Sequence, residues 1–457
     1  MNSPKRLAIV GTGISGLGCA YKLRHQKNLS ITLFEKENRL GGHSNTIDYS
    51  PPNSSKPAYG IDTGFLVFNK WTYPRLVKLF EELDVPVANS DMSFSVSIPL
   101  ASKSENLEWA GTNLSTVFAQ RKNLLNPQFW GMLRDIIKFN RLGKALAKST
   151  KNDSLHPSKL QTVEEFLDAN QLGLAFRNWY LLPMIGAIWS CPASEMMKFP
   201  IQTLMHFCKN HGLLNILHRP QWLTVKGGSR EYVKRIAEQL NSAGVVIQKD
   251  GVKEARRLED QTIELMTESG KRYVVDELVF ACHSDDILGI LKNPSEDEID
   301  ILKSIPYQKN TAYVHADATL LPKNSKVWAA WNYSTSSLKS GQIDASSRVC
   351  VHYLINQLQP LPDDLSKAPV VVSLNPHQLP KTELTHSVIH YSHPLFDAGA
   401  IDAQHRLPMI QGVANIWYCG AWTGYGFHED GLRSGELVAE DIIERLTAPV
   451  ASTEMAK

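Results

Sequence analysis

Short apolar runs bounded by glycine alternate with amphipathic stretches at the start of the chain. Residues 6–10 are apolar with β-branched members and end at a glycine, which predicts a strand buried on both faces. A glycine-rich turn and a helix follow, and a second apolar strand is predicted over residues 31–34. The pattern therefore predicts a strand, turn, helix and strand unit around which the chain is organised.

The same periodicities predict the later elements. Apolar residues at helical spacing predict helices at 72–83, 126–151, several within 172–217, and 230–240. Strands are predicted at 96–100, 244–252, 278–281 and, as a hairpin, 261–267 with 272–275. From residue 306 strands dominate, at 310–315, 327–333, 349–356, 370–374 and 388–391. A proline-rich stretch at 50–57 is predicted to join two strands of a hairpin, and a last buried strand ends at Tyr418, before a helix that starts near Asp430.

The first turn carries the pattern G-x-G-x-x-G at Gly11, Gly13 and Gly16. In a strand–turn–helix context these glycines permit a tight turn, backbone approach to a pyrophosphate and close packing of helix on strand. The pyrophosphate would lie on the helix N-terminus, where free N–H groups and the helix dipole favour anions. Glu35 follows Gly16 by nineteen residues, at the end of the second strand, which is the position of a carboxylate that binds an adenosine ribose. The ligand is therefore predicted to be FAD or NAD.

The next residues favour FAD. Residues 35–44, EKENRLGGHS, resemble the E-x-x-x-R-x-G-G segment of the flavin amine oxidase superfamily. The resemblance implies that Arg39 and the glycine pair hold the FAD diphosphate, and a guanidinium fork suits phosphate. Residues 59–65 resemble the segment that approaches the flavin ring, and residues 416–437 the closing strand and helix whose N-terminus faces the flavin edge. The positions expected on FAD are Gly11, Gly13, Ile14, Ser15, Gly16, Glu35, Lys36, Arg39, Gly42, His43, Ser44, Gly64, Phe65, Val252, Gly420, Asp430, Gly431 and Leu432.

The resemblance covers essentially the whole chain and implies an α/β fold: a Rossmann-type FAD-binding domain with an interleaved α+β substrate domain. The expected FAD-binding domain comprises residues 1–70, 220–290 and 405–457. The expected substrate domain comprises residues 71–219 and 291–404, with a helical part at 113–219 and a mixed sheet at 291–404.

Six further motifs resemble a bacterial-type subgroup of this superfamily, often encoded beside cyclopropane fatty acid synthase and fused to it in plants. They are GAIWS at 186–190, NHGLL at 210–214, RPQW at 219–222, WNY at 331–333, SLNP at 373–376 and GFHEDG at 426–431. The resemblance implies a flavoprotein that acts on fatty acyl chains of membrane lipids, for example as a desaturase, with a functional link to a fatty acid methyltransferase-type enzyme. Hydride would pass from a carbon to the flavin, with a proton removed at its neighbour.

His428 and Glu429 are the candidates for acid–base chemistry, and Tyr425 is a weaker one on the same turn. His428 also has a structural interpretation, a hydrogen bond to a carbonyl, and Asp430 could serve only as a helix N-cap. Phe427 stands where amine oxidases carry a tyrosine of their aromatic cage, and no lysine is assigned the flavin-water role. Three alternatives remain: a fatty acid double-bond isomerase, an amine oxidase, and a lipid carrier without FAD.

The composition limits the partners. The formal charge of +2 and pI near 8.1 give no global case for nucleic acid. Six scattered cysteines without a C-x-x-C pair indicate a reduced compartment. The N-terminus is expected to leave no room for a signal peptide. The seven histidines between residues 315 and 405 lack metal-ligand spacing, so no metal is expected. Segment 126–151 carries Trp130, six basic residues and one acid, which suits a helix on an anionic lipid surface, although an ordinary surface helix has similar patterning. We therefore expect a cytoplasmic protein with peripheral contact to the inner face of the membrane.

Overall fold

The computed structural model describes residues 3–50, 58–99, 105–149, 161–189, 192–215, 218–335, 338–339, 342–343 and 349–447. The proline-rich stretch 51–57, Ser190 of the GAIWS motif, and residues 150–151 of the basic segment lie outside them. The chain forms two compact units, the first of residues 1–42, 232–303 and 404–457 and the second of residues 43–231 and 304–403. By this division, residues 43–70 and 220–231 group with the second unit and residues 291–303 with the first.

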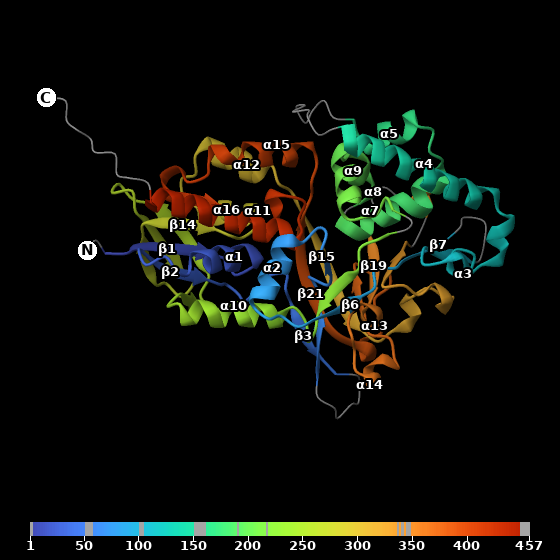
Figure 1. Cartoon of the computed structure of the whole chain (residues 1–457), viewed down its shortest axis with the longest axis horizontal. Helices are drawn as coiled ribbons and strands as arrows, with labels where there is room; N and C mark the ends of the chain where they lie inside the picture. Colours follow the sequence, from blue (N-terminus) through green and yellow to red (C-terminus); the bar gives the residue numbers. More distant parts are fainter. Residues whose placement is uncertain are drawn as a thin grey trace. The chain divides into compact units, whose positions relative to one another are not determined.

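The first unit is built on a parallel sheet of five strands in the order β10-β2-β1-β14-β22 (Figure 1). Its strands are β1 (Lys5–Val10), β2 (Leu29–Phe34), β10 (Val246–Gln248), β14 (Glu277–Phe280) and β22 (Ile416–Tyr418). Its helices are α1 (Ile14–Leu23), α10 (Arg230–Ser242, from Tyr232 onward), α11 (Ser284–Ile290), α12 (Glu296–Lys303) and α16 (His428–Thr447). Strands β1 and β14 are interior to this sheet, and their paired residues are buried and apolar except for Glu277, as in a sheet covered on both faces.

The predicted strand 244–252 is wrong as a single element. Strand β10 ends at Gln248, and Val252 begins β11 (Val252–Arg257), which pairs with β12 (Ile263–Thr267) and β13 (Arg272–Val275) in a separate antiparallel sheet. The break occurs at Gly251, whose carbonyl accepts from the Glu268 backbone N–H at 2.8 Å. An added Cβ on Gly251 would lie 2.9 Å from the Cβ of Lys36, so the turn passes close to the end of β2.

The second unit contains a sheet of seven strands in the order β21-β15-β20-β19-β16-β7-β8. The strands are β7 (Phe94–Pro99), β8 (Asn106–Ala110), β15 (Tyr307–His315), β16 (Trp331–Ser334), β19 (Cys350–Leu354), β20 (Val371–Leu374) and β21 (Thr385–Pro394). Cross-strand neighbours Val314, Val372, Tyr353 and Trp331 line one face of this sheet. The predicted strand 327–333 is therefore displaced, because residues 325–327 form a short 3-10 helix and pairing begins at Trp331.

Smaller sheets complete the second unit. Strands β3 (Thr46–Tyr49) and β4 (Tyr59–Asp62) are antiparallel, which confirms the two strands that flank the proline-rich stretch. Strands β5 (Phe68–Asn69), β9 (Trp222–Val225) and β6 (Val87–Ser90) form a third sheet.

The helical part of the second unit gathers α4, α5, α7, α8 and α9 (Figure 1). Its helices are α3 (Leu114–Val117), α4 (Pro127–Ser149), α5 (Val163–Ala169), α6 (Leu174–Phe176), α7 (Leu182–Trp189), α8 (Ala193–Lys198) and α9 (Ile201–Asn210), and α2 (Pro74–Glu82) and α15 (Ala398–Arg406) lie outside this part. The predicted helix at 126–151 thus corresponds to α4. Among the described residues, none of the helices is long and apolar enough to cross a membrane.

Candidate functional site

The glycines of the first turn are required by the protein's own backbone. Gly11 has a φ of +108°, and a Cβ there would lie 2.7 Å from the carbonyl oxygen of Ala281, just after β14. A Cβ on Gly16 would lie 2.0 Å from the carbonyl oxygen of Gly11. Real Cβ atoms do not approach so closely, so both positions exclude a side chain before any ligand is considered.

Gly13 is different, because an added Cβ would meet no protein atom within 4 Å. Gly13 is the N-cap of α1, has no side-chain cap, and is followed by a first turn without an acidic residue. The helix N-terminus therefore keeps its donors and its positive potential facing open space, which suits a phosphate group.

Glu35 is buried and fixed on the glycine turn. One carboxylate oxygen, Oε2, accepts from the backbone N–H of Thr12 at 3.1 Å and from the Thr12 hydroxyl, and Oε1 accepts from the N–H of Glu37 at 2.9 Å. An ionised carboxylate has about four acceptor sites, so capacity remains for a ribose hydroxyl. Neighbouring Lys36, which was predicted on the cofactor, pairs with Asp286 of α11 at 3.5 Å.

The loop after Glu35 lies against the same turn. Arg39 Nη1 donates to the Gly42 carbonyl at 2.7 Å, and the N–H of Gly41 donates to the Thr12 carbonyl at 3.0 Å. A Cβ on Gly42 would lie 3.2 Å from the Cα of Gly13. Arg39 and Gly42 are therefore beside the helix N-terminus, where a diphosphate would need them.

Helix α16 packs on α1 through glycine. A Cβ on Gly435 would lie 2.1 Å from the Ser15 carbonyl oxygen, and one on Gly431 would lie 2.8 Å from Ile14 Cγ2 and 3.0 Å from Ser15 Oγ. On α1, a Cβ on Gly18 would lie 2.5 Å from Leu432. The first turns of the two helices thus lie side by side, which brings together two predicted parts of the site that are more than 400 residues apart.

Asp430 differs from its expected place, because α16 begins at His428 rather than near Asp430. Its Oδ2 accepts from the N–H groups of Tyr425 and Phe427, each at 3.1 Å, so the carboxylate holds the turn before the helix. Burial raises the pKa of Asp430. Gly420 is fixed in the same region because its N–H donates to Ser434 Oγ of α16 at 2.9 Å.

The three catalytic candidates lie on this turn and the first turn of α16. His428 Nε2 lies 3.1 Å from the hydroxyl of buried Tyr232, the residue at which α10 enters the first unit. Burial lowers the pKa of His428 to about 3, so the imidazole is neutral at pH 7. Glu429 and Tyr425 are half-buried, and burial raises the pKa of Tyr425.

Four predicted cofactor residues lie in the second unit: His43, Ser44, Gly64 and Phe65. A Cβ on Gly64 would lie 2.2 Å from the His43 carbonyl oxygen, and that carbonyl accepts from the Phe65 N–H at 3.0 Å. The two short segments are thus neighbours. Gly64 was expected to leave space for the flavin ring. The contact with the His43 carbonyl already requires a glycine at this position.

Sequence reasoning missed the residue that holds this region. Asp62, at the end of β4, accepts from the N–H of Ser229 at 2.9 Å, from its hydroxyl at 2.7 Å, and from Thr46 Oγ1 at 2.6 Å. It therefore joins the β3–β4 pair to the glycine turn that precedes α10. Burial raises the pKa of Asp62 to about 6. The aspartate of the segment 59–65 was the available signal.

A second missed group crosses the seven-stranded sheet. The hydroxyl of Ser373 lies 2.6 Å from both His315 Nε2 and His352 Nδ1. The Asp317 N–H donates to His315 Nδ1 at 3.0 Å, so His315 carries its proton on Nε2, Ser373 donates to His352, and His352 Nε2 donates toward Ser334 Oγ at 3.1 Å. Burial lowers the pKa of His315 to about 4 and that of His352 to about 3, so both rings are neutral. These histidines are structural, as expected for most of the set.

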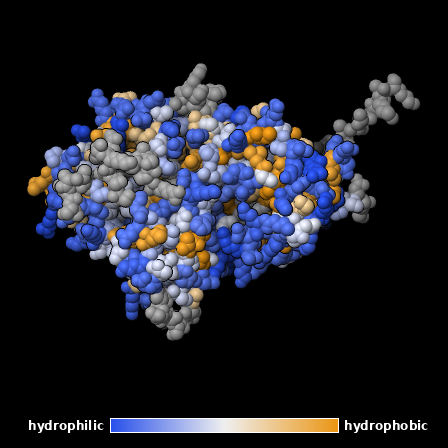
Figure 2. All heavy atoms as spheres, turned by 180° about the vertical axis from the view of Figure 1, so that it is seen from behind, coloured by the Kyte–Doolittle hydropathy of each residue, from blue (hydrophilic) through white to orange (hydrophobic). Residues whose placement is uncertain are grey.

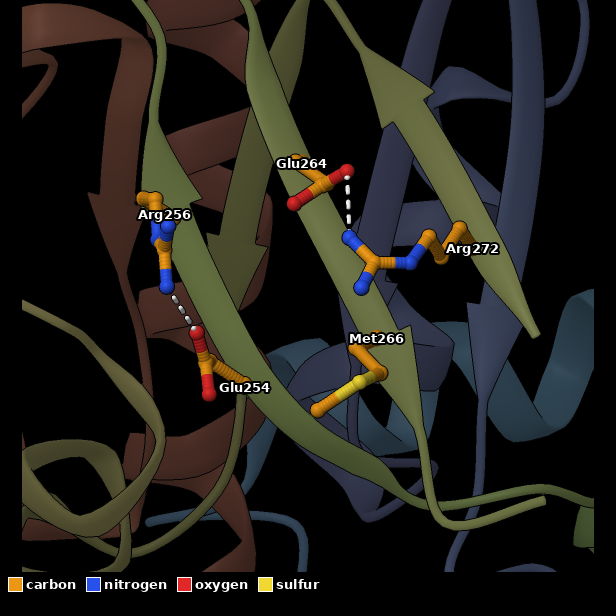
Figure 3. A pocket seen from close by; sticks show the side chains of 5 residues that line it. All are labelled: Glu254, Arg256, Glu264, Met266 and Arg272. Atoms are coloured by element: carbon orange, nitrogen blue, oxygen red, sulfur yellow. Dashed lines mark hydrogen bonds and ion pairs between the residues drawn. The ribbon is translucent and has the colours of Figure 1, made fainter. Parts of the chain in front are cut away.

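Two other polar groups do not resemble the dinucleotide site. Figure 3 shows a pocket on β11, β12 and β13 in which Arg256 pairs with Glu254 and Arg272 with Glu264, each at 2.9 Å. Its charges neutralise one another, and Met266 is its apolar member. Within the described part of the chain, one metal-like group occurs, His283 with Asp285 and Asp286. Asp286 of this group already forms an ion pair with Lys36, and exposed acidic groups are common without a metal.

The first unit thus fits the predicted FAD on three counts. Open space faces the N-terminus of α1 at Gly13, Arg39 stands beside it, and Glu35 is fixed at the end of β2. Val252 begins β11 directly after the turn that passes Lys36, in keeping with its predicted contact with adenine.

Solved structures of known proteins share this fold along nearly the whole chain. A cyclohexylamine oxidase from Brevibacterium oxydans is 13% identical with a TM-score of 0.65, over 97% of this chain and 99% of that one. A fatty acid isomerase from P. acnes is 14% identical with a TM-score of 0.64, over 98% of this chain and all of that one. At this identity the likeness concerns the fold alone.

Sequence similarity to curated proteins is confined to a short segment. Protoporphyrinogen oxidase 2 of Arabidopsis thaliana is 47% identical over 45 residues, which are 10% of this chain. The chain thus spans 9% of the length of that relative.

A family model covers far more of the chain. The model described as flavin containing amine oxidoreductase matches residues 14–443, and proteins of this family are FAD-dependent oxidoreductases. The predicted amine oxidase-like fold, FAD cofactor and oxidoreductase class are thereby confirmed, whereas the link to cyclopropane fatty acid synthase stays a prediction. Since this match runs from residue 14 to residue 443, the chain belongs to the flavin-containing amine oxidoreductase family.

Proposed function

We propose that this protein dehydrogenates fatty acyl chains of membrane lipids and so introduces a double bond. FAD, when bound, supplies the hydride acceptor. The protein supplies the base that takes the proton from the neighbouring carbon, so the substrate loses one hydride and one proton. The two electrons then pass to oxygen or another acceptor.

The observation that carries the proposal is the position of His428 at the first turn of α16, next to the N-terminus of α1. Its ring is neutral at physiological pH because burial lowers its pKa to about 3, and it is held 3.1 Å from the Tyr232 hydroxyl at the first turn of α16. A hydrogen bond donated by Tyr232 to Nε2 would leave Nδ1 as the protonated nitrogen, and release of that bond frees Nε2 as the acceptor. Tyr232 is thus a positioning residue for the base.

The interior of the second unit supports an apolar substrate over a charged amine. Trp189 lies 4.5 Å from Phe207 and 5.8 Å from Phe199, ring centre to ring centre, and His211 stacks on Phe207 at 3.9 Å. Burial lowers the pKa of His211 to about 4, so this aromatic group carries no charge at pH 7. This uncharged apolar interior is more compatible with a hydrocarbon chain than with an ammonium group.

A fatty acid isomerase is the second candidate. The P. acnes isomerase shares the fold, and its name shows that the fold accommodates a fatty acid. The same base and hydride acceptor would serve, with the hydride returned to the substrate and no net oxidation. Amine oxidation is less well supported, because Phe427 lacks the hydroxyl of the tyrosine expected in an aromatic cage.

The test follows the flavin absorbance of the purified protein anaerobically while lipid vesicles or amines are added. Bleaching by vesicles with unsaturated or methylated acyl chains, but not by amines, is the expected result. A persistent band with moved double bonds would establish isomerisation instead. Bleaching by amines alone, or a protein without flavin, contradicts the proposal.

Substitution of the base sharpens this test. His428→Gln is expected to slow flavin reduction by about 10²- to 10⁴-fold with the flavin content unchanged, because a general base contributes on that order. Tyr232→Phe is expected to have a smaller effect and to change the pH profile of reduction. His25→Gln, at an exposed histidine of the same unit, is the control. An unchanged rate in His428→Gln would remove this residue from the mechanism.

A further inference from the structure

Exposed apolar side chains are concentrated in one short stretch of the second unit. Of the sixteen large hydrophobic residues that are exposed in the described part of the chain, five lie between residues 114 and 137. They are Leu114, Leu124, Leu125, Trp130 and Ile137, and Leu114 and Leu125 are 78% and 89% exposed. Figure 2 shows hydrophobic residues between hydrophilic ones on one face of the molecule.

This stretch is ordered by its own hydrogen bonds, so the exposure belongs to the fold. Trp130 Nε1 donates to the Leu124 carbonyl at 3.0 Å, and the rings of Trp130 and Phe118 lie 5.3 Å apart. Asn113 caps α3 by accepting from the Thr116 N–H at 3.1 Å. We call the segment 114–130, which comprises α3, the 3-10 turn Arg121–Leu125 and the start of α4, the apolar tip (Figure 1).

A row of cations continues from the tip along α4. Trp130, Arg134, Ile137 and Arg141 follow at spacings of four, three and four residues, which places them in one stripe, and all four are exposed. Lys144 and Lys148 are exposed further along the helix, and Arg121 and Lys122 lie in the tip.

The described acidic residues near this row do not neutralise its positive charge. Asp135, the acid of α4, is buried and accepts from the Gly173 N–H at 2.9 Å, although it also pairs with Arg134 at 3.2 Å. Glu105 pairs with Lys122 at 2.6 Å. Arg141, Lys144 and Lys148 remain as a cationic row on the exposed side.

We propose that the apolar tip and the cationic row of α4 form a docking surface for an anionic phospholipid bilayer. Leu114, Leu124, Leu125 and Trp130 enter the boundary between headgroups and acyl chains, and the cations of α4 lie on the phosphates. The helix alone was the sequence-based expectation; the structure adds the tip as the inserting part. The purpose of the surface rests on the proposed function, because an enzyme of acyl chains in a bilayer must reach them.

The chemistry favours a bilayer over a second copy of the chain. A symmetric contact through this face would bring the cationic row near its own equivalent, and like charges repel. The protruding leucines and the interfacial tryptophan match the requirements of a lipid boundary, which is apolar below and anionic above.

The test is co-sedimentation of the full-length protein with two kinds of vesicle. One is pure phosphatidylcholine, and the other contains about 30 mol% phosphatidylglycerol, which gives the surface a negative potential. We expect binding to the anionic vesicles that weakens as salt rises. Leu124→Ser with Leu125→Ser is expected to reduce the partition coefficient at least about tenfold, since each buried leucine side chain contributes one to three kcal/mol. Leu379→Ser, at a leucine that is 62% exposed elsewhere in the same unit, is the control.

Charge reversal separates the two components. Arg141→Glu with Lys144→Glu is expected to abolish the preference for phosphatidylglycerol, whereas Lys234→Glu on α10 leaves it unchanged. A failure to bind either vesicle, or binding that ignores both double variants, overturns the proposal. A dimer in light scattering that dissociates in the leucine variant also overturns it, in favour of an interface between copies.

The outcome is separable from that of the proposed function. If soluble fatty acids bleach the flavin while vesicles do not bind, the docking surface fails and the acyl reaction stands. If vesicles bind through the tip but no lipid reduces the flavin, the docking surface stands and the acyl reaction fails.

Discussion

Two regions, the glycine contacts of α1 in the first unit and the row of buried histidines in the second, are held by different means. In the first, backbone meets backbone: Gly16 faces the Gly11 carbonyl and Gly435 faces that of Ser15, with no room for a methyl group. In the second, buried polar side chains hold the strands, as in the row from His315 through Ser373 to His352. The first arrangement depends on the absence of side-chain atoms at the glycines, and the second depends on the protonation state of its histidines.

The difference predicts how each unit fails. The stability of close backbone packing does not depend on pH, but one added carbon atom lowers it, because backbone atoms cannot move aside. A hydrogen-bonded row tolerates small changes in volume but loses its pattern when an acceptor nitrogen is protonated. Perturbations that add a carbon or a proton therefore distinguish the units.

The largest effect is expected for Gly16→Ala. Its Cβ would lie 2.0 Å from a backbone oxygen, so β1 and α1 must separate, at a cost of about 3 kcal/mol or more in the free energy of unfolding. Urea denaturation of the purified protein measures this cost. Gly289→Ala, in α11, adds the same methyl group where nothing lies within 4 Å, and it is expected to be neutral or stabilising. Equal stability of the two variants would contradict the shape argument.

Gly13→Ala is expected to separate cofactor binding from folding. Its backbone has a φ of −64°, which alanine adopts readily, and its Cβ meets no protein atom within 4 Å. The methyl group would occupy the space assigned to the pyrophosphate, so FAD affinity is expected to fall about a hundredfold, or roughly 2.7 kcal/mol. Flavin titration of the apoprotein measures the affinity. Full affinity with alanine at this position would place the phosphates elsewhere.

The smallest effect concerns acid. The folded-state pKa values of His315 and His352, about 4 and about 3, lie below the unfolded value near 6.5. Between these limits the unfolded chain binds more protons, so stability falls as pH drops below 6.5 and the loss is complete only below pH 3. We expect the two rings together to lose about 2 kcal/mol of stability between pH 6.5 and 5.5, measured by denaturation at each pH.

The matched variants for this effect are His352→Gln and His390→Gln. The first removes a buried ring and is expected to flatten the pH dependence while lowering stability at pH 7. The second removes an exposed ring and is expected to leave the pH dependence unchanged. A pH dependence that persists in full in His352→Gln would place its origin outside the row.

The accuracy of the sequence predictions follows the same division. Strands β1 and β2 and helix α1 were predicted to within a few residues, because Gly11, Gly13, Gly16 and Glu35 occupy a pattern whose spacing is set by one local turn. The row at Ser373 was not predicted, because its three strands are distant in sequence and their register decides which side chains meet.

Two predicted strands failed for local reasons. Segment 244–252 is apolar at both ends, but Gly251 turns the chain between two sheets. The predicted strand 327–333 begins late, because Asn324 accepts from the Lys326 N–H and starts a helical turn that includes Val327. The apolar content of a segment alone does not predict such a turn.

The contact between α1 and α16 also sets an order of events during protein synthesis. Helix α1 emerges among the first residues, whereas Gly431 and Gly435, which cover its first turns, emerge more than 400 residues later. At typical elongation rates this interval is on the order of tens of seconds. The nascent β1–α1 segment therefore waits with an uncovered apolar side for its last partner, and a ribosome-bound chaperone that shields this segment would serve the chain throughout its translation.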